Sequence, residues 1–384
     1  MKLTVRVISA DQHREWISQR SSVSFLQLPE WGKVKLGWES ESLGWFLDSE
    51  LVGAGLVLYR AVPKFPSRSL AYLPEGPDID WLHEVHPDIA INDWLAPMLA
   101  HCRAHGAFQV KMGPPIATRR WKADSIKDAM AQWREDIATP PAHLHDVIAD
   151  WHSVEAQHLS VQLNSRGWIQ ETATGAGFGD VQPRYVFQID LRDRTLGEIF
   201  TGFNQLWRRN IRKAEKTGVV VSLGQREDLA DFHRVYVETA ARDHFTPRGL
   251  SYFEKMWDEL NSVHPGRLTL HVARYEDHVA AATLMVRVGT HAWYAYGAST
   301  TADRDVRPSN ALQWDMIQLA HSSGCQIYDL RGIADTLNPD DHLFGLVQFK
   351  VGTGGYAQEY LGEWDYILRS TWSKAYGLYQ SRRG

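Results

Sequence analysis

Five basic residues are crowded at the end of one amphipathic pattern. Apolar residues recur at helical spacing from Phe200 to Ala214 and predict a helix with one buried stripe. Basic side chains near a helix C-terminus are stabilised by the helix dipole, which is the simpler interpretation. The alternative is a phosphate clamp, because guanidinium groups bind phosphate oxygens in a bidentate manner. The basic residues are Arg208, Arg209, Arg212, Lys213 and Lys216.

Two later stretches carry side chains suited to a ligand site. Tyr294 and Tyr296 stand two apart in a strand pattern, which predicts that both phenols point to one face. They would suit the wall of a peptide or sugar channel, although a sheet face packed under a helix is the commoner explanation. Asp329 and Arg331 are predicted to share a face at the end of the next strand, where open α/β folds place ligands. A local ion pair explains them equally well.

Lys350 follows Phe349 and leads into a loop with three glycines. Glycines let a backbone approach a ligand closely, but an exposed lysine beside a turn is common. In segment 25–35, aromatic residues are interleaved with Lys33 and Lys35, a pattern that is also typical of a surface helix.

Familiar metal and nucleophile signatures are absent. The sequence contains no H-E-x-x-H, no G-x-S-x-G and no P-loop. His83 and His86 have no neighbours in the sequence that would complete a metal site. We therefore predict chemistry without a metal, a cofactor or a covalent nucleophile.

Composition narrows the class of protein. The 384 residues suit two domains, and 44% hydrophobic content is that of a folded protein. The net charge of -5 argues against a protein that coats DNA, but it allows local contact with a tRNA end. Cys102 and Cys325 have no partner in any disulfide or zinc pattern, which favours a reducing cytoplasm. No signal peptide or spanning segment is predicted, and a transient visit to a membrane surface stays open.

Strand and helix patterns alternate along the whole chain and predict mixed α/β sheets. Helices are expected at 86–105, 123–134 and 151–166, and one long helix is expected at 195–217. The glycine-rich stretch 172–182 is predicted to be a hinge between two domains.

Six stretches in one order resemble the FemABX family of peptidoglycan aminoacyltransferases, and the match is densest from about Tyr185 to Asp365. The stretches are FLQLPEWGKVK, RRNIRKAEKTGV, YVETAARDHFTPRGLSYFEKMW, AWYAYGAS, NALQWDMIQLAHSSGCQIYDLRGI and FGLVQFKVGTGGYAQEYLGEWD.

The resemblance implies two domains of the GNAT acyltransferase type, without the helical hairpin of longer family members. The first is expected at 1–181, with the tail 362–384 packing back on it, and the second at 182–361. The implied reaction moves an amino acid from aminoacyl-tRNA to the stem peptide of a peptidoglycan precursor, either lipid II or UDP-MurNAc-pentapeptide. The implied location is the cytoplasm, at the inner face of the membrane. The transferred amino acid, the form of the acceptor and the oligomeric state stay open.

The resemblance also implies roles for particular residues. Lys350 would stabilise the oxyanion formed on the ester, and Phe349 would shape the pocket. Lys35 and Arg209 would hold the precursor's diphosphate, with Lys33 and Arg212 as close competitors. Tyr294, Tyr296 and Arg331 complete the expected substrate-binding set.

One position departs from the family pattern. Gly113 stands where members often carry an acid that has been considered as a proton acceptor, so the general base stays unnamed. Two alternatives also remain: a GNAT-like transferase that uses acyl-CoA, and a protein that binds muropeptide or RNA without catalysis. The first is disfavoured because we find no clean R/Q-x-x-G-x-G/A turn.

Overall fold

Contacts divide the chain into two compact units in a computed structural model that describes residues 3–133, 139–170 and 182–381. The first unit contains residues 1–120, 151–184 and 359–384, and the second contains 121–150 and 185–358. The expected boundaries of 1–181 and 182–361 thus misplace segment 121–150. The reason is apolar burial, because Trp121, Ile126 and Leu144 belong to the core of the second unit. The hinge expected at 172–182 lies, except for Gln182, outside the described residues.

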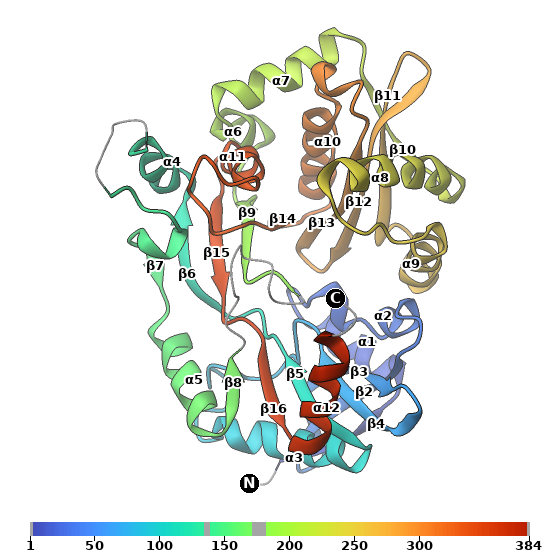
Figure 1. Cartoon of the computed structure of the whole chain (residues 1–384), viewed down its shortest axis with the longest axis vertical. Coiled ribbons are helices and arrows are strands. Elements are labelled where there is room, and N and C mark those ends of the chain that lie inside the picture. Colours follow the sequence, from blue (N-terminus) through green and yellow to red (C-terminus); the bar gives the residue numbers. More distant parts are fainter. Residues whose placement is uncertain (1–2, 134–138, 171–181, 382–384) are drawn as a thin grey trace. The chain divides into compact units, whose positions relative to one another are not determined.

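The first unit is built on a seven-stranded mixed sheet in the order β1-β2-β3-β4-β5-β16-β8 (Figure 1). Its parallel pair, β4 with β5, stays joined to the ends of both strands, where Leu73 pairs with Met112. The tail strand β16 pairs with both β5 and β8. The strands are β1 (Leu3–Ile8), β2 (Glu39–Leu47), β3 (Glu50–Val62), β4 (Phe65–Leu73), β5 (Ala107–Met112), β8 (Trp168–Gln170) and β16 (Trp364–Ile367). The helices are α1 (Ala10–Ser18), α2 (Pro29–Val34), α3 (Ile91–Ala104), α5 (Val154–Ser165) and α12 (Ser370–Ser381), with a 3₁₀ turn η1 (Phe25–Gln27).

The second sheet is also mixed, and its strands follow the order β10-β11-β12-β13-β14-β9-β15-β6-β7. The boundary between the units falls within β6 and β15. The strands are β6 (Ala117–Lys122), β7 (Trp151–His152), β9 (Tyr185–Asp190), β10 (Val220–Gly224), β11 (Leu268–Tyr275), β12 (His278–Val288), β13 (His291–Ser299), β14 (Ile327–Gly332) and β15 (Tyr356–Tyr360). The helices are α4 (Ala123–Ala131), α6 (Leu196–Gly202), α7 (Gln205–Lys216), α8 (Leu229–Asp243), α9 (Leu250–Val263), α10 (Pro308–Ser322) and α11 (Phe344–Val351), with 3₁₀ turns η2 (Leu144–Asp146), η3 (Arg226–Asp228) and η4 (Arg304–Val306).

The parallel pair of the second unit separates after three residues. His291 to Trp293 pair with Ile327 to Asp329, and beyond that point β13 continues only beside β12. β14 meanwhile shifts register against β9 between Asp329 and Gly332. The ends of two neighbouring parallel strands therefore diverge here, whereas the equivalent pair of the first unit stays joined.

The long helix expected at 195–217 is wrong because the chain turns at Phe203. α6 ends at Gly202 and α7 begins at Gln205, with the Asn204 side chain accepting a hydrogen bond from the Trp207 N–H at 2.9 Å. The Asn204 N–H itself donates to the Gly352 carbonyl at 2.8 Å. An N-cap residue and a distant partner for its backbone thus divide one helical pattern into two helices.

Three other expectations needed correction. The helix expected at 151–166 begins at Val154, because Ser153 caps it and residues 151–152 form a short strand. The helix expected at 86–105 begins only at Ile91. Segment 25–35 is not a surface helix, because most of its apolar side chains are buried in the first unit. Among the described residues, no helix combines the length and the apolar character that crossing a membrane requires.

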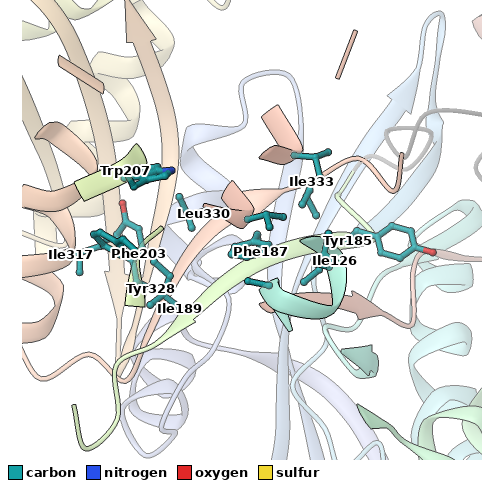
Figure 2. Packing of buried hydrophobic residues seen from close by; sticks show 14 of the residues in the cluster. Ile126, Tyr185, Phe187, Ile189, Phe203, Trp207, Ile317, Tyr328, Leu330 and Ile333 are labelled. Atoms are coloured by element: carbon teal, nitrogen blue, oxygen red, sulfur yellow. The ribbon is translucent and has the colours of Figure 1, made fainter. Parts of the chain in front are cut away.

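The core of the second unit joins the β14 strand to α7 and α10. Figure 2 shows Phe203 and Trp207 grouped with Ile317 and Tyr328, and Leu330 lying next to Phe187. These side chains are close to fully buried. The predicted apolar stripe from Phe200 to Ala214 is therefore confirmed as the inner face of α6 and α7, which fixes the opposite face of α7 toward solvent.

We expect Gly354→Ala to lower the free energy of unfolding by more than about 3 kcal/mol. Gly354 has φ +73°, and a Cβ would overlap the Gly202 carbonyl that ends α6. Gly218→Ala is the matched control, because its φ is +92° but nothing lies within 4 Å of the added Cβ. The control should lose only the backbone cost of about 1 kcal/mol. Equal losses in urea denaturation would contradict the close packing of this loop on α6.

Candidate active site

Lys350 is the buried cation at the end of the separated strand. It lies on α11, its side chain is 4% exposed, and its ammonium donates to three consecutive backbone carbonyls of β14. The Nζ to oxygen distances are 2.8 Å for Leu330 and 3.4 Å for Arg331, with Gly332 as the third acceptor. An ammonium has three donors, so each is directed at one carbonyl.

The backbone of β14 is turned to present these carbonyls. Arg331 has φ +61°, in the left-handed region that is unusual for a residue other than glycine. The Asp329 carboxylate accepts a hydrogen bond from the Arg331 N–H at 2.5 Å and so supports this conformation. Asp329 therefore contacts Arg331 through the Arg331 backbone N–H. The two sequence-based expectations for this pair were a shared strand face and a side-chain ion pair.

Asp329 is itself buried in a polar network. The Gln188 amide donates to its Oδ2 at 2.9 Å, and the Tyr356 hydroxyl donates to the Gln188 carbonyl oxygen at 3.0 Å. His291 Nε2 lies 3.4 Å from the same carboxylate oxygen. Burial alone would raise the pKa of Asp329, but His291, Arg331 and Gln188 together hold that pKa below its ordinary value. Asp329 is thus a fixed negative charge near the Lys350 ammonium.

The Lys350 ammonium has an unusual acidity. Burial lowers the pKa of Lys350 from 10.5 to about 7. The charge of Asp329 opposes this shift, and that of Arg331 adds to it. At neutral pH the Lys350 ammonium is therefore close to the pH at which it loses its proton.

α7 is fastened directly to α11. The Trp207 indole N–H donates to the Phe349 carbonyl at 2.7 Å, and the two rings lie 4.6 Å apart. Phe349 packs against the core of the second unit. Phe349 and Lys350 therefore lie beside the helix that carries Arg209.

The basic residues of α7 divide into two groups. Arg208 donates to the Thr201 carbonyl at 2.7 Å, so it caps the end of α6. The other four stand at helical spacing on one exposed face, and among the described residues no acid forms an ion pair with them. Ion pairing therefore does not account for this group, which we call the α7 basic face. Its members are Arg209, Arg212, Lys213 and Lys216. Lys213 and Lys216 lie in the last turn of α7, where the helix dipole favours them.

The prediction that Tyr294 and Tyr296 share a face is wrong. Tyr294 pairs with Met285 and Tyr296 pairs with Leu284, so β13 carries one extra residue, Ala295. Directly paired residues point to the same face, and Leu284 and Met285 are adjacent in their strand. The bulge therefore sends the two phenols to opposite faces of the sheet.

Each tyrosine has a different environment. The Tyr294 hydroxyl lies over the Cα of Gly297, where any side chain would collide with it, and burial raises the pKa of Tyr294 to about 12. The Tyr296 hydroxyl lies 3.2 Å from that of Tyr252 on α9, and its ring contacts Phe253. The two residues cannot form a single wall.

Lys33 and Lys35 lie on and just after α2 of the first unit. Lys33 is exposed, and the Lys35 ammonium lies 5.8 Å from the centre of the Trp31 ring. Because Arg209 belongs to the second unit, the joint action of Lys35 and Arg209 on one diphosphate stays a prediction.

A carboxylate fills the space beside Gly113. A Cβ added at Gly113 would lie 2.9 Å from Cγ of Glu363, which is 1% exposed. The Tyr72 hydroxyl donates to Glu363 at 2.7 Å, and the Lys111 ammonium lies 3.9 Å away. A buried carboxylate thus lies beside Gly113, the position where, by the resemblance, family members often carry an acid. It comes from the segment before β16, and no local sequence pattern indicated it.

We expect the stability of the protein to depend on Lys350 in a defined pH window. The folded pKa of Lys350 is about 7 and the unfolded pKa is near 10.5, so the unfolded chain binds more protons between these values. Lys350 therefore adds stability as pH rises through this window, with a slope of about 1.4 kcal/mol per pH unit. Lys350→Met should lack this increment in denaturation measured at pH 7.5 and 9.5. Parallel changes in both proteins would contradict the burial of the ammonium.

Comparisons with known proteins show the family and the fold. A model of the FemAB family matches residues 8–264, and a model of the acetyltransferase (GNAT) domain matches residues 204–341. The chain is 23% identical to the lipid II:glycine glycyltransferase of Staphylococcus haemolyticus (strain JCSC1435), over 94% of this chain and 92% of that protein. The protein of the same name from Staphylococcus aureus is also 23% identical, with the same coverage.

Solved structures show the same fold. The crystal structure of FemX has a TM-score of 0.77 at 21% identity and covers 97% of this chain and 99% of its own. A tandem GNAT protein from the clavulanic acid biosynthesis pathway has a TM-score of 0.53 at 11% identity, over 96% and 99% of the two chains. The predicted α/β class with two GNAT-like domains is therefore confirmed. Because the family model spans more than half of its residues, this chain belongs to the FemAB family.

Proposed function

We propose that this protein transfers an amino acid from aminoacyl-tRNA to an amine on the stem peptide of a peptidoglycan precursor. One observation carries the proposal: a buried ammonium, Lys350, stands at the end of two diverging parallel strands, beside an exposed basic helix face. We propose that the acyl group enters where the strands diverge, that the ammonium offers charge for an oxyanion, and that the basic face binds phosphate.

The named relatives support the substrate class. They are lipid II:glycine glycyltransferases, and they match this chain over almost its full length. We therefore propose lipid II or its soluble UDP-MurNAc-pentapeptide form as the acceptor. The buried, unbridged Cys102 and Cys325 fit a reaction in the cytoplasm, at the inner face of the membrane.

The proposed reaction requires the protein to orient the two substrates and to stabilise the charge of the oxyanion. A neutral amine of the acceptor attacks the ester carbonyl and an oxyanion forms. Its collapse breaks the ester C–O bond, and the leaving tRNA oxygen takes up the proton that the amine loses, which gives the free tRNA hydroxyl. An ester is already activated, so orientation and oxyanion stabilisation supply most of the rate. We propose that Lys350 gives up one carbonyl acceptor to face the oxyanion, while the other carbonyls keep it in place.

The α7 basic face is the proposed site for the precursor's diphosphate. Arg209 and Arg212 carry guanidinium groups, which suit two adjacent phosphates better than a single ammonium does. Lys35 on the first unit is proposed as a further contact with the diphosphate. Arg331 supplies one of the backbone carbonyls that the Lys350 ammonium binds. Because Tyr294 and Tyr296 point to opposite faces of the sheet, only one of them can line the proposed site.

Transfer from acyl-CoA is the second candidate, favoured by the GNAT-domain match. In GNAT folds a glycine-rich turn before a helix cradles the CoA pyrophosphate. Here the segment 300–307 between β13 and α10 has no glycine and contains Asp303 and Asp305. The segment also contains Arg304 and Arg307, so its formal charge is balanced. The absence of glycine is what disfavours a CoA pyrophosphate at that turn.

The direct assay combines the purified protein with a pool of charged tRNAs and either precursor form, read by mass spectrometry. We expect the precursor to gain the mass of one amino acid residue and free tRNA to appear. Lys350→Met should keep precursor affinity and lose product formation by roughly 100-fold. Product from acyl-CoA alone would favour the second candidate. Binding of both substrates without product would identify a non-catalytic protein.

We expect Arg209→Met to weaken the binding of UDP-MurNAc-pentapeptide by about tenfold or more, because a charge-assisted contact to phosphate is lost. Arg234→Met on α8 is the matched control, since Arg234 is 55% exposed and outside the basic face. Calorimetry at fixed ionic strength measures both affinities. If the two variants bind equally well, the α7 basic face is not the diphosphate site.

A further inference from the structure

A cluster of two histidines and one aspartate lies outside the proposed reaction centre. His143 and His145 flank Leu144 in the 3₁₀ turn region of η2, and Asp335 follows β14. One ligand atom from each of the three residues lies within 4.8 Å of the others. The sequence analysis missed the cluster because 190 residues separate His145 from Asp335.

The three side chains converge on one point. His143 Nδ1 lies 3.4 Å from Asp335 Oδ1, and His145 Nδ1 lies 3.3 Å from Asp335 Oδ2. Two ligand atoms of a tetrahedral zinc ion stand about 3.3 Å apart when each is about 2.05 Å from the metal. Each nitrogen–oxygen contact therefore has about the separation of two ligand atoms on one ion, and the two contacts are made to different oxygens of the Asp335 carboxylate.

His143 Nδ1 is the atom that the protein leaves unsatisfied. It is buried from solvent and has no hydrogen-bond partner, despite its distance to Asp335. A buried ring nitrogen without a hydrogen bond is costly, and an ion placed between the nitrogen and the carboxylate would satisfy it. On the neighbouring ring, His145 Nε2 lies 3.6 Å from Asp146, and Nδ1 forms a hydrogen bond with Asp335 Oδ2 at 3.3 Å that an ion between the two atoms would replace.

The backbone holds the cluster together before any ion arrives. The Leu144 N–H donates to the Asp335 carbonyl at 2.7 Å, and the Leu337 N–H donates to the Ala142 carbonyl at 2.7 Å. Leu144 is fully buried, so alternation along the segment directs its two histidine neighbours away from the core. The imidazole rings stack nearly parallel, with centroids 5.0 Å apart, so one ring must rotate for both Nδ1 atoms to bind a single ion.

We propose that His143, His145 and Asp335 bind one divalent transition-metal ion of the Zn²⁺ class. Two imidazoles and one carboxylate suit zinc and related ions, whereas Ca²⁺ and Mg²⁺ prefer oxygen ligands. The ion would join segment 142–145 to the residues that follow β14. Since Gly332, three residues before Asp335, holds the Lys350 ammonium, the metal would stiffen the segment that ends the reaction centre. The proposal does not depend on the identity of the transferred group.

The test is a titration of chelator-treated, full-length protein with Zn²⁺, and with Co²⁺ for its visible spectrum. We expect one equivalent to bind, and His145→Gln or Asp335→Asn to weaken that binding by about 100-fold or more. His158→Gln, which removes an exposed histidine elsewhere, is the control and should bind as wild type does.

Thermal unfolding gives an independent reading, because an ion that binds only the folded chain raises the melting temperature. Zn²⁺ should raise it in wild type and in His158→Gln but not in His145→Gln. His145 is half exposed, so His145→Gln should fold normally without metal, as its circular dichroism would show. One-equivalent binding that survives in His145→Gln, or no binding to wild type at roughly 100 μM Zn²⁺, would overturn the proposal.

Discussion

The second unit depends on one interaction: an ammonium enclosed by three carbonyls of one strand end. Each backbone carbonyl that is buried without a donor costs free energy, and β14 presents three at the point where its parallel partner has diverged. Lys350 satisfies all three, and Asp329 stabilises the turned backbone that presents them. Replacing the lysine by Met would remove all three hydrogen bonds, so the turned strand end and the buried charge form one arrangement.

The two units use related sheets in different ways. In the first unit the parallel strands β4 and β5 remain paired to their ends, and a buried cluster of Glu363, Tyr72 and Lys111 closes that edge. In the second unit the corresponding strands separate, and the exposed basic face of α7 lies on the helix attached to α11. In the proposed function the second unit supplies the reacting groups. The two units share a fold class and differ in how their parallel strands pair.

Structure that follows from periodic sequence patterns could be predicted. Structure that depends on partners distant in the sequence could not. The apolar stripe of α7 and its charged face followed from helical spacing, and Lys350 followed from resemblance to a family. The break at Asn204 depends on Gly352, nearly 150 residues away, so no local pattern reveals it. The reversed orientation of Tyr294 and Tyr296 results from one inserted residue in β13, which period-two reasoning cannot detect. The polar network around Asp329 was missed because three separate strands supply it, through Gln188, His291 and Tyr356.

The state of the Lys350 ammonium can be observed directly by ¹⁵N NMR of lysine side chains titrated against pH. The account predicts one resonance that titrates near pH 7, exchanges slowly with solvent and disappears in Lys350→Met. A spectrum in which every lysine titrates near pH 10.4, the ordinary value for an exposed amine, would show that no ammonium is enclosed at the end of β14 and would contradict the account.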